Sequence, residues 1–100
     1  MTLEGEFHAA MVKLYETAKR ELGYNATYFL GMISEHGGVE AARRLLATDK
    51  PSEGFTTLWG SRRLDLSVEA HVLDPHFEPL FTGDERRTAR RRLEQYGFRP

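Results

Sequence analysis

The sequence contains no cysteine, and this absence excludes several kinds of protein. Without thiols the chain has no disulfide bond, no thiolate zinc site and no cysteine nucleophile. Secreted domains of similar size usually depend on disulfides for their stability. The N-terminus carries Glu4 and Glu6 where a signal peptide has a basic region followed by an apolar run. We therefore expect a cytoplasmic protein.

Long apolar runs are also missing. Uninterrupted apolar stretches are only a few residues long, far short of the ~20 that a membrane span requires, so no contact with a membrane is expected. Apolar residues nevertheless make up 40% of the 100 residues and charged residues 29%, which is typical of a globular chain and not of a disordered one. We expect a single helical domain over residues 1–100 with one hydrophobic core.

Apolar residues recur every three or four positions along most of the chain, which is the period of a buried helical face. Near the N-terminus the pattern consists of Phe7, Met11, Leu14, Ala18 and Leu22. The predicted fold class is all-α, a compact bundle of five to six short helices. We predict helices at about 3–22, 25–36, 38–47, 52–60, 65–74 and 82–96, with a tight turn over 75–81.

Residues with known preferences for helix ends mark several boundaries. Asn25 is a good N-cap for the second helix. Glycine adopts positive φ without steric cost, so Gly37-Gly38 should end the second helix. Gly60 should stop the fourth helix.

Leu64–Val68 alternates apolar and polar residues like a strand. No second alternating run exists to pair with it, so we predict a short helix there instead.

The charge distribution reverses near the C-terminus. Residues 64–85 carry six acids and no Lys or Arg, whereas residues 86–99 carry six arginines and one acid, Glu94. At 100° per residue, four of these arginines fall within about 140° of the last helix, beside its apolar face. We call them the arginine stripe: Arg86, Arg87, Arg90 and Arg91. The stripe could bind phosphates, pair with the acidic segment before it, or meet an acidic protein; Glu94 within it counts against phosphates.

The two predicted helices over residues 25–47 are joined by a short glycine turn, as in a helix-turn-helix. The second of them would present Glu40, Arg43 and Arg44 to DNA. Two cations with a nearby acid equip it poorly for this role. Such helical hairpins are more often ordinary packing units, so DNA recognition by this pair is the less favoured hypothesis.

Motifs for catalysis or metal binding are absent. The four histidines include no pair at i, i+4, and there is no H-E-x-x-H, no G-x-S-x-G and no phosphate-binding loop. Only His71, Asp74 and His76 could converge, around the turn at Pro75. We therefore predict no metal, no cofactor and no catalytic residues, and an enzyme is not the favoured class.

The sequence is similar to a family of small bacterial proteins usually labelled uncharacterised. The resemblance extends from about Phe7 to Phe98, and it implies an all-helical bacterial domain that stands alone. It implies no activity, cofactor or catalytic residue. The segments that carry it are 23–30, 35–42, 54–59 and 63–69.

Polar residues surround the single tryptophan and define a candidate interaction surface: Trp59, Arg62, Arg63, Asp65 and Glu69. An exposed tryptophan beside charges is a typical binding anchor, although we expect burial in the core for this one. Two functional hypotheses follow. The protein either binds a protein partner or a copy of itself near Trp59, or it binds nucleic acid through the arginine stripe with help from Arg43 and Arg44.

Overall fold

The computed structural model describes residues 2–99, which form six α-helices and two short 3-10 segments. In chain order they are α1 (Leu3–Leu22), α2 (Thr27–His36), α3 (Gly38–Leu46), α4 (Glu53–Gly60), η1 (Leu64–Leu66), α5 (Val68–Val72), η2 (Pro75–Leu80) and α6 (Gly83–Gln95). No strand occurs between residues 2 and 99, so the all-α prediction is confirmed. The alternating run Leu64–Val68 forms η1 and the start of α5.

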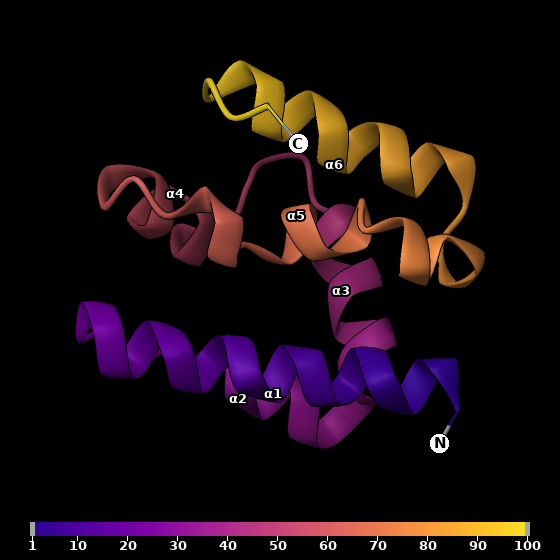
Figure 1. The fold of residues 1–100 in the computed structure, drawn as a ribbon, viewed down its shortest axis with the longest axis horizontal. Coiled ribbons are helices and arrows are strands. Elements are labelled where there is room, and N and C mark those ends of the chain that lie inside the picture. The colour runs from indigo at the N-terminus through magenta and orange to yellow at the C-terminus, as the bar shows by residue number, and fades with distance from the viewer. Residues whose placement is uncertain (1, 100) are drawn as a thin grey trace.

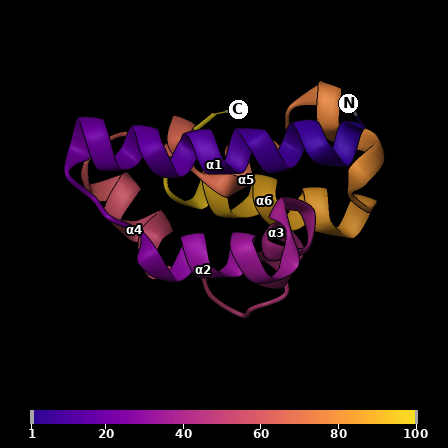
Figure 2. The ribbon, with the colours of Figure 1, turned by 90° about the horizontal axis from the view of Figure 1, so that it is seen from below.

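The central element is α3, which packs against α1, α2, α5 and α6. Figure 1 shows α1 along one side of the molecule and α6 along the other, with α3 and α5 between them. Figure 2, turned by 90°, shows α2 at one edge of the molecule. The short helices α3 and α5 therefore lie between the two longest ones, and α3 contacts both of them.

One continuous cluster of buried apolar side chains fills the interior. Phe7 of α1 is fully buried, and its ring meets Phe77 and Phe81 edge-on, with centroids 5.0 and 5.1 Å apart. Edge-to-face pairs at this spacing stabilise the fold beyond the contribution of burying the rings. The predicted turn over 75–81 thus supplies aromatic side chains that hold α1.

The helix ends agree with the sequence only in part. Thr82 and Glu85 form a complete capping box at the start of α6. Asn25, in contrast, does not cap α2, whose N-cap is Ala26 without a side-chain hydrogen bond. The Asn25 Oδ1 instead accepts a 2.5 Å hydrogen bond from the hydroxyl of Tyr15, a buried residue. A buried hydroxyl needs a partner, and this need explains the different role of Asn25.

The glycine pair between α2 and α3 has two separate functions. Only Gly37 has positive φ, at 84°. Gly38 lies where α1 and α3 cross, and a Cβ there would be 2.7 Å from the Cα of His8. The Gly38 N–H donates to the His8 Nδ1 at 3.0 Å, so a side chain of α1 serves the uncapped start of α3. Gly38 is therefore required for the approach of the two helices.

We expect Gly38→Ala to lower the free energy of unfolding by about 1–3 kcal/mol, because the new methyl group meets backbone atoms that cannot move aside. Gly31→Ala is the matched control. Gly31 lies inside α2 with nothing within 4 Å of an added Cβ, so that change should raise stability by up to about 1 kcal/mol. Urea unfolding of both variants measures the difference. Equal effects at the two positions would contradict the close helix crossing.

Candidate functional site

Trp59 is exposed, and the prediction that it is buried was wrong. Its side chain lies on the last turn of α4 with 51% of its surface accessible. The indole ring meets the Tyr96 ring edge-on, with centroids 5.4 Å apart. Tyr96 in turn meets Phe55, which is 2% exposed, at 5.1 Å. The three rings form a row from the core to the surface, so the exposed tryptophan is held in place by packing.

A shallow pocket of about 230 Å³ lies beside this row of rings, where the C-terminal ends of α4 and α6 meet. We call it the aromatic pocket. It is smaller than the roughly 300–1,000 Å³ of small-molecule sites, which favours a single projecting side chain as its occupant. The lining residues are Trp59, Arg62, Leu64, Tyr96, Gly97 and Phe98.

The same backbone motif ends both helices at this pocket. After α6, the Phe98 N–H donates to the Leu93 carbonyl at 2.9 Å, and Gly97 takes a left-handed φ of 82°. After α4, the Arg63 N–H donates to the Leu58 carbonyl at 2.8 Å, and the left-handed residue is Arg62, with φ of 59°. This is the Schellman arrangement, whose left-handed position usually carries glycine.

α4 ends at Gly60 as predicted, but the left-handed residue lies two positions further along, at Arg62. The C-cap of α4 is Ser61. Arg62 is the only non-glycine residue with positive φ in residues 2–99. That backbone conformation costs a residue with a Cβ about 1–2 kcal/mol. The chain therefore places a strained arginine at the rim of the aromatic pocket.

Two of the other residues predicted around Trp59 neutralise one another. The Arg63 guanidinium contacts the Glu21 carboxylate at 2.9 Å and the Asp65 carboxylate at 3.1 Å. The hydrogen bond from Arg63 lowers the pKa of Glu21, and the two carboxylates raise the pKa of Arg63. These ion pairs tie η1 to the C-terminal end of α1, so Arg63 and Asp65 act within the fold.

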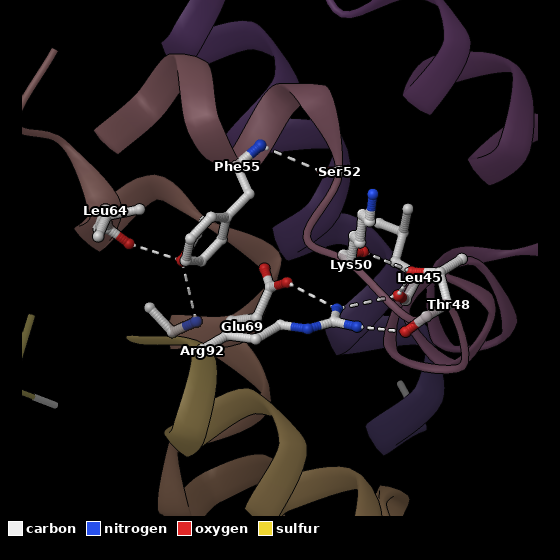
Figure 3. A network of polar contacts seen from close by, with 10 residues as sticks. Leu45, Thr48, Lys50, Ser52, Phe55, Leu64, Glu69 and Arg92 are labelled. Atoms are coloured by element: carbon white, nitrogen blue, oxygen red, sulfur yellow. Dashed lines mark hydrogen bonds and ion pairs between the residues drawn. The ribbon is translucent and has the colours of Figure 1, made fainter. Parts of the chain in front are cut away.

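Glu69 is 3% exposed, so its assignment to the surface was wrong. It lies in α5 opposite Arg92 of α6, which is equally buried. The Arg92 Nη1 donates to the Leu45 carbonyl at 3.0 Å and to the Glu69 carboxylate at 3.4 Å, while Nη2 donates to the Thr48 carbonyl (Figure 3). Arg92 thereby adds a second side-chain donor to the Leu45 carbonyl in the last turn of α3, which also accepts from the Thr48 hydroxyl at 2.7 Å. It also supplies a donor to the Thr48 carbonyl just beyond the helix, a region where backbone carbonyls lack partners within the helix.

Burial raises the pKa of Glu69, and the attraction of Arg92 opposes this only in part. The guanidinium is shared with two carbonyls and reaches the carboxylate through one nitrogen at 3.4 Å. The ionised carboxylate is therefore incompletely compensated for its lost hydration.

The arginine stripe divides into residues that have a partner and residues that do not. The Arg86 Nη1 donates to the Val72 carbonyl at 2.8 Å, and Arg87 pairs with Asp84. Arg90 and Arg91 are exposed and make no ion pair or side-chain hydrogen bond within the described chain. Two of the four predicted cations thus remain unpaired.

The arginines of α3 are also engaged. The Arg43 guanidinium donates to the Leu80 carbonyl at 2.8 Å and lies 3.9 Å from Glu85, and Arg44 pairs with Glu40 at 3.2 Å. Arg43 thereby connects α3 to η2 and α6, and Arg44 makes an ion pair within α3. The structure does not join them to Arg90 and Arg91 in one unpaired cationic surface.

A larger groove of about 610 Å³ lies between the N-terminal parts of α1 and α3 and the segment η2. Its polar groups serve the fold: the His8 Nδ1 accepts from Gly38, and Arg43 donates to Leu80. No hydroxyl or thiol side chain lines it among residues 2–99, so no serine, threonine or cysteine nucleophile lies beside His8 or His36 there.

The histidines around Pro75 do not converge. The His71 Nδ1 lies 2.9 Å from the Ser67 carbonyl oxygen, and the His76 Nε2 lies 3.2 Å from Glu6. Within residues 2–99, no group of three or more His, Asp or Glu side chains could hold a metal ion. In the same range no helix is long and apolar enough to cross a membrane.

No protein-family model matches the chain, and no curated protein or solved structure does so either. The resemblance to small bacterial proteins therefore stays a prediction.

We expect Arg92→Met to lower the free energy of unfolding by about 3–5 kcal/mol, because the buried Glu69 carboxyl group loses its partner and the carbonyls of Leu45 and Thr48 each lose a hydrogen bond. Arg91→Met is the matched control one residue away, exposed and unpaired in the described structure, and should change stability by no more than about 0.5 kcal/mol. Urea unfolding compares them. Similar losses in both variants would contradict a specific role for the Arg92 contacts.

A second prediction concerns pH. Because the pKa of Glu69 is raised in the folded state, the folded chain keeps a proton that the unfolded chain has already released. The contribution of Glu69 to stability is therefore largest below the ordinary carboxyl pKa and falls as pH rises through the raised value. Relative to Glu69→Gln, the wild-type chain should lose free energy of unfolding as the pH rises above the ordinary carboxyl pKa of about 4. The opposite slope would show that Arg92 dominates.

Proposed function

We propose that this protein is a protein-interaction module that binds a partner through the aromatic pocket. The observation that carries the proposal is the exposed Trp59, held edge-on by Tyr96 at the rim of a pocket of side-chain size. Tryptophan, tyrosine and arginine are the residues most enriched among those that dominate binding energy. All three line this one pocket.

The rigidity of the aromatic row supports the same proposal. Binding costs free energy when mobile side chains must be ordered at an interface. Here Phe55 is fixed in the core, Tyr96 packs on Phe55, and Trp59 packs on Tyr96. A partner would therefore meet a surface that is already ordered.

Nucleic-acid binding remains the alternative, and it has less support. It would rest on Arg90 and Arg91, since Arg86 and Arg87 are engaged by Val72 and Asp84. Few phosphates would be neutralised, and affinity for duplex DNA scales with that number.

The test uses a library of random peptides displayed on phage and panned on the wild-type chain, with counter-selection on Trp59→Ala. We expect peptides that bind the wild type and lose at least about tenfold in affinity on Trp59→Ala, as for a binding hot spot. Tyr28→Ala is the matched control, because Tyr28 is also an exposed aromatic residue, at 80%, and lies outside the pocket. Calorimetric titration of synthetic copies of the selected peptides gives the affinities.

Circular dichroism and thermal unfolding should show that Trp59→Ala keeps the wild-type fold. Failure to select any peptide above the Trp59→Ala background would contradict the proposal. A titration with a fluorescent oligonucleotide covers the alternative. Binding that weakens steeply with salt and disappears in Arg90→Gln/Arg91→Gln would favour nucleic acid instead.

A further inference from the structure

We infer that the partner of the aromatic pocket is an acidic protein segment, in which a carboxylate stands next to the apolar side chain that enters the pocket. Arg62 is the residue that would recognise this carboxylate. The inference rests on the proposed function and adds the chemistry of the partner to it.

The first support is the distribution of charge around the pocket. Arg62 is the only charged side chain among the residues that line it, and it is exposed. Within residues 2–99 it makes no ion pair or side-chain hydrogen bond. The neighbouring Arg63, in contrast, is held by Glu21 and Asp65. The unsatisfied charge at this site is therefore positive and belongs to one residue.

The second support is the strained backbone at Arg62. Two helices end at the pocket with the same hydrogen-bonding pattern, and α6 places Gly97 at the left-handed position. α4 places Arg62 there, although its own glycine, Gly60, lies only two residues earlier. Strain at a position that glycine would relieve is a recognised mark of functional sites. The side chain of Arg62 is the feature that glycine could not supply.

A purely structural role for Arg62 makes a different prediction. The C-terminal ends of α4 and α6 each carry a partial negative charge, and a cation between them could simply offset it. Arg62→Gln would then lower stability in a salt-dependent way and leave peptide binding unchanged. In our proposal Arg62→Gln changes peptide binding and leaves stability nearly unchanged.

The experiment uses the peptides selected on the wild-type chain with Trp59→Ala counter-selection. We expect them to carry Asp or Glu beside an apolar anchor. Changing that acid to its amide should weaken binding to the wild type by about three- to tenfold, and should have no effect on binding to Arg62→Gln. Arg90→Gln, an exposed arginine outside the pocket, should keep the full preference for the acid.

Arg62→Gly separates binding from folding. Relief of the left-handed strain should raise its melting temperature by a few degrees, while its affinity for the acidic peptides falls as in Arg62→Gln. A more stable variant that binds less well cannot be explained by partial unfolding. A lower melting temperature for Arg62→Gly would contradict the strain argument.

The outcomes distinguish the two proposals. Peptides that depend on Trp59 but are indifferent to Arg62 and to the acid would overturn the acidic partner and leave the interaction module standing. A preference for acids that is lost in Arg90→Gln would overturn it as well. Failure to select peptides that depend on Trp59 would overturn both proposals.

Discussion

The central helix α3 is held at both ends by side chains from distant parts of the chain. At its start the His8 ring of α1 accepts the Gly38 N–H, and at its end Arg92 of α6 donates to the carbonyls of Leu45 and Thr48. Helix ends need such partners because their backbone groups have none within the helix. The two longest helices are thereby fixed on opposite sides of a short one, and the arrangement of the bundle follows.

The aromatic pocket depends on the same constraint. Arg92 and Tyr96 lie one turn apart on α6, so the contact that anchors Arg92 to the end of α3 also determines where the Tyr96 ring lies. Tyr96 then packs between Phe55 and Trp59 of α4. A buried polar network and an exposed aromatic surface are therefore consecutive parts of one helix, and the position of the surface is set by the interior.

The periodicity of the apolar residues was sufficient to predict the helices. A helix that buries one face has apolar residues three or four positions apart, and this spacing is visible in the sequence. It was not sufficient for the site. Arg92 lies three residues after Ala89 and four before Tyr96, and Glu69 lies three before Val72. Both charged residues thus lie on predicted apolar faces. This position in the pattern could have indicated that their side chains are buried. The hydrogen bonds from Arg92 to carbonyls 44 and 47 residues away are tertiary and leave no local pattern.

The exposure of Trp59 had no local signal either, because it depends on how the distant end of α6 packs against α4. The left-handed turn at Arg62 is closed by hydrogen bonds within the end of α4, but an arginine gives no sign in the sequence of that backbone conformation. The Arg92 contacts also have a consequence for synthesis on the ribosome. The first three helices emerge early, and His8 can dock at once on the start of α3. Until residue 92 leaves the exit tunnel, the Leu45 carbonyl has only the local donors of Thr48, and the Thr48 carbonyl is left to water. Nascent chains that stop short of α6 would therefore lack the tertiary contacts that fix the end of the central helix, and would be open to chaperones.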